Sequence, residues 1–108
     1  MEPTLIAEVG CTHIGNMDRA RKLILLAKNS GADVVKFQKR NPKESVPSEL
    51  CDKPHPNEFY SYGKTYLEHR EKLEFTQSQH AELKAYCKEV GIEYFCSVWD
   101  ETSAREII

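Results

Sequence analysis

The fold is decided by the first third of the chain, where residues 5–38 run LIAEVGCTHIGNMDRARKLILLAKNSGADVVKFQ. Residues 5–9 are rich in β-prone side chains and predict a first strand. Apolar residues recur at spacings of three and four over residues 17–30, and Asn16 stands where a helix N-cap belongs, so a helix follows. Residues 34–38 predict a second strand. The stretch therefore predicts a right-handed strand–helix–strand unit with two parallel strands.

The same order repeats further along the chain. Thr76-Gln77-Ser78-Gln79 is a capping-box sequence that predicts the start of another helix, and Gly91 is placed to end it. The remaining predicted elements are a helix over residues 77–90, a strand over 94–98, and a last helix that Asp100 caps and that continues to the chain end. The predicted fold class is α/β, with parallel strands and helices outside them.

A long connection separates the second strand from the helix at 77–90. Residues 39–75 hold four of the five prolines, and one short helix is predicted near residues 64–73. Connections of this kind usually have two to six residues, so about 37 suggests a functional loop. It runs from a strand to a helix, which places it at the carboxyl edge of the sheet, where α/β folds bind their ligands.

Composition excludes several functional classes. The chain has 108 residues and a net charge of −2, and its longest apolar run, residues 23–27, is too short for a membrane span or a signal peptide. A near-neutral balance argues against a nucleic-acid partner. The four cysteines show no Cys-x-x-Cys spacing, which disfavours a zinc site and favours reduced thiols. We therefore expect a cytoplasmic protein.

Three polar side chains occupy strand positions that a purely structural strand would fill with apolar residues. Alternation along each strand places Glu8, Lys36 and Gln38 on one face, near the ends of adjacent parallel strands. Burying such charges is costly unless they are paired or used. Two interpretations remain open: a Glu8–Lys36 salt bridge that only neutralises the interior, and a site for a polar ligand.

Other candidates are weaker. His13 lies in the loop after the first strand, either as an ordinary loop histidine or as a site-lining side chain that orients Glu8 or touches a substrate. Ser97 ends the third strand and offers a hydroxyl, although such residues often bond locally. Arg70, beside His69, is a candidate contact to an anion or sugar on a segment that is first of all amphipathic and solvated. Because no glycine-rich phosphate motif occurs, a dinucleotide is not expected.

Three blocks carry a resemblance to a known family. The sequences IAEVGCTHIGN (6–16), GADVVKFQ (31–38) and GIEYFCSVWD (91–100) resemble the amino-terminal part of the sialic acid synthase family. The resemblance implies the first three βα units of a (β/α)8 barrel. It also implies condensation of phosphoenolpyruvate with an N-acylated hexosamine, such as N-acetylmannosamine, to a nine-carbon 2-keto acid with release of phosphate. A divalent metal, Mn²⁺ or Mg²⁺, is expected to assist.

The resemblance also implies roles for individual residues. Glu8 matches the glutamate that acts as a base at the reacting centre, and His13 matches the histidine of the opening motif. Lys36, Gln38 and Ser97 match residues that contact phosphoenolpyruvate. The Cys96-Ser97-Val98-Trp99 sequence departs from the family's Ser-Thr-Pro-Phe pattern, which leaves the placement of the Ser97 hydroxyl open. The metal ligands are expected in later strands and not in this chain.

Size limits what these residues can do alone. A (β/α)8 barrel needs about 250 residues, so we expect residues 1–108 to be one amino-terminal piece of a synthase domain, inactive alone, whose full-length parent is a homodimer. A second hypothesis is a small non-catalytic α/β module that binds a sugar or a partner. A third is a barrel lyase in which Lys36 forms a Schiff base with a pyruvate-type substrate.

Overall fold

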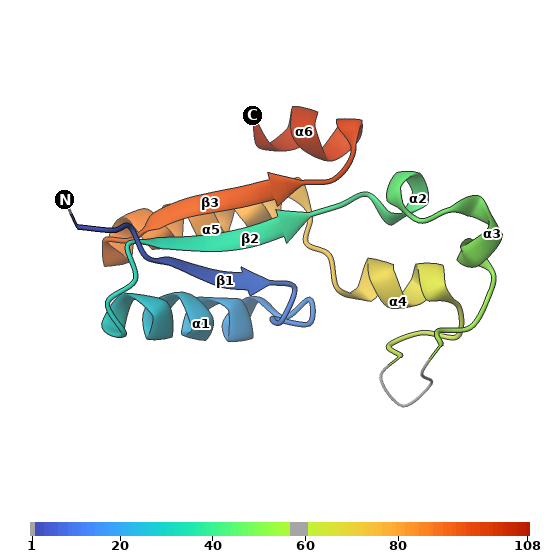
Figure 1. Cartoon of the computed structure of the whole chain (residues 1–108), viewed down its shortest axis with the longest axis horizontal. Coiled ribbons are helices and arrows are strands. Elements are labelled where there is room, and N and C mark those ends of the chain that lie inside the picture. Colours follow the sequence, from blue (N-terminus) through green and yellow to red (C-terminus); the bar gives the residue numbers. More distant parts are fainter. Residues whose placement is uncertain (1, 57–60) are drawn as a thin grey trace.

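The computed structural model describes residues 2–56 and 61–108, and it contains a three-stranded parallel sheet (Figure 1). The strands are β1 (Ile6–Gly10), β2 (Val34–Lys39) and β3 (Glu93–Val98), in the order β1-β2-β3. Each strand pairs with the next in sequence, as right-handed βαβ connections produce. The predicted class, parallel strands with outer helices, is confirmed.

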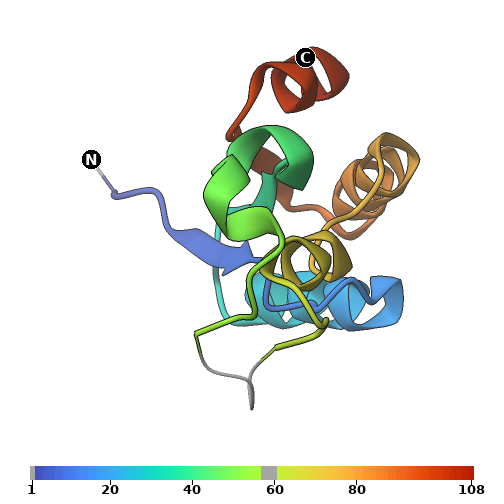
Figure 2. The same cartoon turned by 90° about the vertical axis from the view of Figure 1, so that its right-hand side faces the viewer.

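Two long helices cover one face of this sheet (Figure 2). They are α1 (Met17–Asn29) and α5 (Gln77–Val90), both close to their predicted limits. The Asn16 side chain caps α1 by accepting from the Arg19 backbone. Thr76 and Gln79 form the predicted capping box at the start of α5. Gly91 ends α5 with φ +86°, in the left-handed region that glycine adopts without strain.

The core fills the space between the sheet and these two helices. Strand alternation sends every second side chain of β2 into it, so Val35 and Phe37 are fully buried. They pack against Ile24 from α1 and Leu83 from α5. The opposite face of the sheet is open over the described residues: Ile6 and Phe95 are 56% and 52% exposed there. The polar strand residues point to this open face.

The connection between β2 and α5 lies across the carboxyl end of the strands (Figure 2). Its described part holds α2 (Pro42–Ser45), α3 (Ser48–Cys51) and α4 (Tyr66–Lys72). Only α4 was predicted, because a four-residue helix is too short to show helical periodicity in the sequence. Residues 57–60 of the predicted connection lie outside the described residues. The connection thus forms a wall beside the strand ends.

The last helix, α6 (Glu101–Ile107), follows β3 and begins where predicted. The Asp100 carboxylate accepts from the Ser103 backbone at 2.7 Å and caps it. Helix α6 packs against β3 and α5 (Figure 1). No helix in the described ranges is long and apolar enough to cross a membrane.

Candidate active site

A carboxylate and an ammonium group face each other on the open side of the sheet. Glu8 and Lys36 are register partners in β1 and β2, and the Lys36 Nζ lies 3.0 Å from the Glu8 Oε2. Their side chains keep 51% and 31% of their surface exposed. The ion pair named in the first interpretation therefore exists, but it is half in solvent. A pair in this position is accessible to a ligand.

Gly10 lets Gln38 approach Glu8. The register of β1 shifts between Glu8 and Gly10, and Gly10 has φ +58°. A Cβ atom at this position would lie 3.0 Å from the Gln38 Nε2 and 3.3 Å from the Glu8 Oε1. Both side chains therefore occupy the space above the glycine. The amide, the carboxylate and the Lys36 ammonium form one polar group at the carboxyl edge.

Arg40 fixes which end of the Gln38 amide faces the ligand side. The Arg40 Nη2 donates to the Gln38 Oε1 at 3.1 Å. A guanidinium group has only donors, so the amide oxygen must face it. The two N–H groups of the amide are then directed over Gly10. Gln38 is thus held as a hydrogen-bond donor toward the Glu8–Lys36 pair.

Ser97 stands beside Gln38 on the neighbouring strand. The two residues are register partners in β2 and β3, so Ser97 reaches the same edge. Its hydroxyl donates to the Phe37 carbonyl at 3.4 Å, which is a long hydrogen bond. A long bond of this kind, between neighbouring strands, is easily exchanged for a bond to a ligand.

A second group of charges lies beyond Gln38, where the long connection meets the strand ends. Arg40 lies 4.1 Å above the ring of Trp99, measured from its Cζ to the ring centroid. Its backbone N–H donates to the Glu74 Oε1 at 2.7 Å. The Arg70 Nη2, from α4, lies 3.6 Å from the Glu74 Oε2. Arg40, Arg70 and Glu74 form what we call the rim cluster.

Burial perturbs the acid–base behaviour of the rim cluster. Burial lowers the pKa of Arg40, and repulsion by the Arg70 charge lowers it further. Burial raises the pKa of Glu74, although a hydrogen bond from the Arg40 backbone and the two arginine charges oppose that change. Both pKa shifts have one cause: burial away from water disfavours the charged form of each side chain. Glu74 links the two arginines, because one of its oxygens accepts from the Arg40 backbone and the other lies 3.6 Å from the Arg70 Nη2.

His13 lies on the other side of the sheet from these groups. Its ring is 1% exposed and stacks on Phe75 at 4.0 Å between centroids. Its Nδ1 accepts from the Gly15 backbone at 3.0 Å. Burial lowers the pKa of His13 to about 4, so the ring is neutral near pH 7. These contacts match the alternative of a loop histidine bonded to the backbone, and they place the ring away from Glu8.

Arg40, Glu74 and Trp99 belong to the site, although none of them was predicted as a site residue. The signal for Arg40 was available, because the alternation that selects Lys36 and Gln38 continues to residue 40. No local sequence pattern predicts that Glu74 or Trp99 belongs to the site. They join the site only through the folding of the long connection and of β3 against β2.

Metal ligands do not gather among the described side chains. Within residues 2–56 and 61–108, no group of three or more histidine, cysteine, aspartate or glutamate side chains is arranged to hold a metal ion. The four cysteines are free thiols. The described groups of this chain therefore do not make a metal site by themselves.

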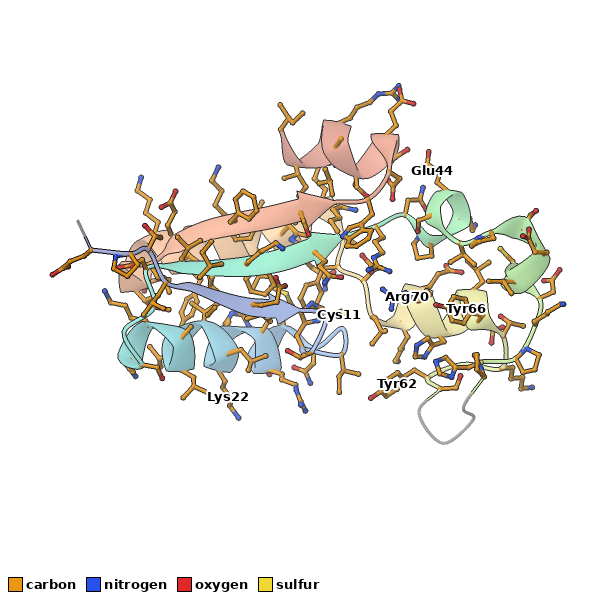
Figure 3. All side chains as sticks on the ribbon, viewed as in Figure 1. Cys11, Lys22, Glu44, Tyr62, Tyr66 and Arg70 are labelled. Atoms are coloured by element: carbon orange, nitrogen blue, oxygen red, sulfur yellow. The ribbon has the colours of Figure 1, made fainter. Side chains whose placement is uncertain are left out.

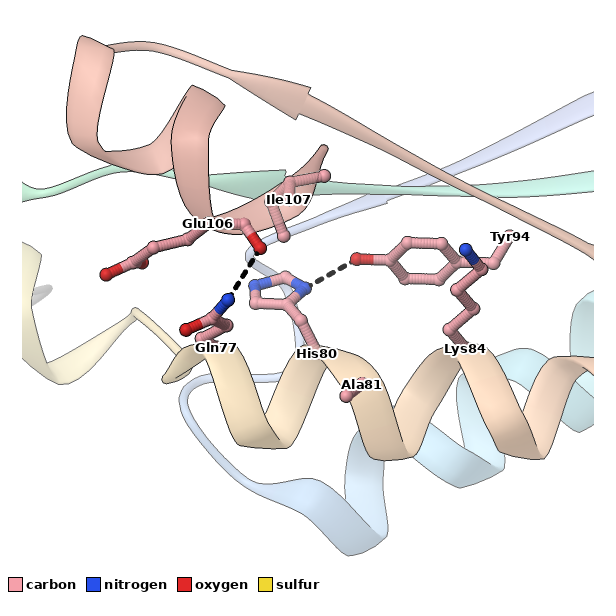
Figure 4. A pocket seen from close by; sticks show the side chains of 7 residues that line it. All are labelled: Gln77, His80, Ala81, Lys84, Tyr94, Glu106 and Ile107. Atoms are coloured by element: carbon pink, nitrogen blue, oxygen red, sulfur yellow. Dashed lines mark hydrogen bonds between the residues drawn. The ribbon is translucent and has the colours of Figure 1, made fainter.

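A separate hollow of about 210 Å³ lies between α5 and α6 (Figure 4). The His80 Nδ1 lies 2.7 Å from the Tyr94 hydroxyl within it, and the Gln77 Nε2 donates to the Glu106 carbonyl at 2.9 Å. Tyr94 alternates with the open-face residues of β3, so this hollow is on the helix-covered side. It is distinct from the polar group at the carboxyl edge.

The three parallel βα units thus carry a carboxylate, an ammonium and an amide at the carboxyl edge of the sheet, the edge where α/β folds bind their ligands. The NeuB family model matches residues 23–108. The chain belongs to the NeuB family, which confirms the resemblance to sialic acid synthases.

Individual relatives agree. The chain is 41% identical to the human N-acetylneuraminate-9-phosphate synthase over 101 residues, 94% of this chain and 28% of that protein. It is 34% identical to the N,N'-diacetyllegionaminic acid synthase of Campylobacter jejuni, over 93% of this chain and 30% of that protein. The chain therefore spans less than a third of the length of these relatives.

A solved structure shows the same fold. The crystal structure of the N-acetylneuraminic acid synthetase from Leptospira borgpetersenii superposes with a TM-score of 0.77 at 22% identity. The match covers 98% of this chain and 33% of the Leptospira chain. The three βα units described above are thus the same arrangement that this barrel enzyme contains.

Proposed function

We propose that the longer enzyme to which this chain corresponds condenses phosphoenolpyruvate with an N-acylated hexosamine to give a nine-carbon 2-keto sugar acid. The observation that carries the proposal is the Glu8–Lys36 contact of 3.0 Å at the carboxyl edge, with the Gln38 amide directed toward it. Such a group offers a cation and a donor for an anionic substrate and a carboxylate for proton transfer.

The proposed steps use these side chains as follows. The Lys36 ammonium and the Gln38 amide bind phosphoenolpyruvate, with the Ser97 hydroxyl as a further donor. The methylene carbon of the enol attacks the open-chain aldehyde carbon of the sugar and forms the new C–C bond, while the aldehyde oxygen takes up a proton from solvent and becomes a hydroxyl group. Water adds to the resulting oxocarbenium carbon, and Glu8 accepts one of its protons and returns it to solvent. The tetrahedral intermediate then breaks its C–O bond to phosphate, its hydroxyl proton leaves with the phosphate, and the 2-keto acid remains.

Further parts of the proposal come from the family resemblance. A divalent metal, Mn²⁺ or Mg²⁺, would polarise the aldehyde, with ligands outside this chain. The enzyme would act as a homodimer. We place it in the cytoplasm, in keeping with four unpaired cysteines. The chain alone is expected to be inactive.

The test is a kinetic study of the longer enzyme with phosphoenolpyruvate and N-acetylmannosamine. Lys36→Ala removes a charged hydrogen bond, which contributes about 1.5–3 kcal/mol, so KM for phosphoenolpyruvate should rise about 10- to 100-fold. Glu8→Gln should lower kcat by about 100-fold or more, because a general base contributes at least that much. Arg21→Ala, at an exposed ion pair with Asp18 on α1, is the matched control and should change neither constant.

Two results would contradict the proposal. Unchanged phosphoenolpyruvate kinetics in Lys36→Ala would remove Lys36 from the site. A covalent adduct on Lys36 after borohydride treatment with pyruvate would instead support the Schiff-base lyase. The ion pair with Glu8 argues against that alternative, because a protonated lysine is not a nucleophile.

A non-catalytic binding module is the second candidate, and one observation favours it. The His69 ring packs against His55, Tyr62 and Tyr66, with centroid distances of 4.4, 5.7 and 5.9 Å. Clustered aromatic rings suit sugar or protein contacts. Binding of N-acetylmannosamine by the longer protein, without any turnover, would support the module.

A further inference from the structure

The rim cluster holds two cations that do not contact phosphoenolpyruvate in the proposed chemistry, in which Arg40 only orients the Gln38 amide. Arg40 follows β2, and Arg70 comes from α4, 30 residues later along the chain. Figure 3 shows the Arg70 side chain extending from α4 toward the carboxyl end of the sheet, in the direction of Cys11. The Arg70 side chain is 12% exposed. The Arg40 backbone and the Arg70 side chain, from elements far apart in sequence, thus meet at the Glu74 carboxylate.

The donors of these two groups are poorly satisfied. The Arg40 Nε and the Arg70 Nη2 are both buried, and neither makes a hydrogen bond to the part of the chain that the structure describes. The Glu74 Oε2 lies 3.6 Å from the Arg70 Nη2, which is beyond hydrogen-bond reach. The other Glu74 oxygen accepts from the Arg40 backbone and not from a guanidinium group. Buried donors without acceptors are costly and call for an explanation.

The net charge of the rim cluster also indicates that an anion is missing. The rim cluster contains two guanidinium groups and one carboxylate, so it has an excess of positive charge. An ion-pair network that served only stability would bring Glu74 within hydrogen-bond distance of both arginines. The observed spacing instead leaves the Arg40 Nε and the Arg70 Nη2 without an acceptor among the described residues, while the Arg40 Nη2 donates to the Gln38 Oε1. Guanidinium forks match the oxygen geometry of phosphate and carboxylate groups.

We propose that Arg40 and Arg70 form an oxyanion-binding subsite, separate from Lys36, for a phosphate monoester or carboxylate group of a substrate. That the ligand is a substrate rests on the proposed synthase function, whereas the subsite itself does not. Lys36 and Arg40 are four residues apart on one extended segment, so their Cα atoms are separated by about 13 Å. Gln38, which accepts from Arg40, lies between the two positions. Lys36 is paired with Glu8 and Arg70 with Glu74, so we expect the two positions to bind different anionic groups.

The chain contains its own reporter for this subsite. Trp99 is the single tryptophan, and its ring lies under Arg40. The 108-residue chain is kept at low micromolar concentration, and inorganic phosphate is titrated into it. Phosphate binding should produce a saturable change in Trp99 fluorescence. Equilibrium dialysis with radiolabelled phosphate measures the same binding without relying on fluorescence. Absence of saturable binding in the dialysis would overturn the proposal.

Variants locate the site. Arg40→Gln and Arg70→Gln should each weaken phosphate binding about tenfold or more, as loss of a charged hydrogen bond predicts. Arg70→Lys keeps the charge but loses the fork, so a smaller loss is expected, and this variant remains informative if the glutamine variants fold poorly. Arg105→Gln, at an exposed pair with Glu101 on α6, is the control. Equal binding in Arg70→Gln and in the unaltered chain would overturn the assignment.

Further ligands identify the source of the oxyanion. N-acetylmannosamine 6-phosphate, compared with unphosphorylated N-acetylmannosamine, tests a phosphate carried by the acceptor. Phosphoenolpyruvate and acetate test the donor and a simple carboxylate. If the affinity for one of these ligands falls in the Arg40 and Arg70 variants, that ligand carries the oxyanion. If the affinity for every ligand is the same in the variants and the unaltered chain, the subsite is overturned. Lys36→Gln should leave phosphate binding at the rim intact, so failure of the synthase chemistry is seen separately.

Discussion

At the scale of single residues, the site depends on a glycine where two side chains meet. Gly10 has a positive φ, and the Gln38 and Glu8 side chains approach it closely. A side chain at position 10 would therefore meet both backbone strain and steric crowding. Strain of this backbone type costs about 1–3 kcal/mol, and the added Cβ would also displace the Gln38 amide. The residue thus connects the backbone of β1 to the chemistry at its end.

Gly10→Ala should therefore lower stability and raise KM for phosphoenolpyruvate in the longer enzyme. Gly31→Ala is the matched control: Gly31 has φ +93°, but nothing lies within 4 Å of the position of its Cβ. Both variants should unfold at lower temperature, and only Gly10→Ala should change KM. If the two variants gave the same KM, the contact above Gly10 would have no part in substrate binding.

Some site residues could be predicted from the sequence, and others could not. Alternation placed Glu8, Lys36 and Gln38 on one face, because the period of a strand is local. The same pattern extended to Arg40, although the strand was expected to end at Gln38. Glu74 could not be found this way, since its partner Arg40 lies 34 residues earlier and only the folded connection joins them.

At the scale of elements, helix α5 is joined to β3 by a buried histidine. His80 is 2% exposed, and its Nδ1 lies 2.7 Å from the Tyr94 hydroxyl. Burial is the largest cause that lowers the pKa of His80 to about 4, with the Lys39 charge second. In the unfolded chain, His80 has its ordinary pKa near 6.5. Between about pH 4 and 6.5 the unfolded chain therefore binds a proton at His80 and the folded chain does not.

Stability should therefore fall as the pH drops from about 6.5 toward about 4, and it should be at its full value above that window. His80→Asn keeps an acceptor near Tyr94 without titrating there, so it should flatten this dependence in part. His13 and His69 contribute in the same direction, because burial lowers the pKa of each. Chemical denaturation at several pH values makes the measurement. A slope unchanged by His80→Asn would contradict the assignment.

Elements with a regular pattern and a cap were predicted almost to the residue. Helices α1 and α5 show apolar periodicity, and each has a side-chain cap. Helices α2 and α3 have neither property, since neither N-cap side chain makes a capping bond. Their form depends on contacts with α4, which lies later in the chain. Local chemistry determines the first pair, and tertiary packing determines the second.

At the scale of the whole molecule, the sheet has one covered face and one open face. Leu5, Ile6 and Phe95 are all more than half exposed. Strands β1 and β3 also have an unpaired edge each over the described residues. Exposed apolar surface beside free strand edges favours association.

The 108-residue chain should therefore associate as its concentration rises, as shown by size-exclusion chromatography with light scattering. Ile6→Lys and Phe95→Lys should reduce this association. Leu26→Lys should not, because Leu26 is comparably exposed, at 62%, but lies on the outer helix α1. A cooperative monomer at every concentration would instead favour the small binding module over the barrel segment.

The length of the connection from β2 to α5 has a consequence for the entropy of loop closure. Pairing of Ile6 with Val34 closes 28 residues, and pairing of Val34 with Glu93 closes 59. Closure entropy grows only with the logarithm of length, so doubling the loop costs about 0.6 kcal/mol. Insertions and deletions in this segment are therefore nearly neutral for the sheet. The wall beside the strand ends can change in length and composition while the scaffold that positions Glu8 and Lys36 stays constant.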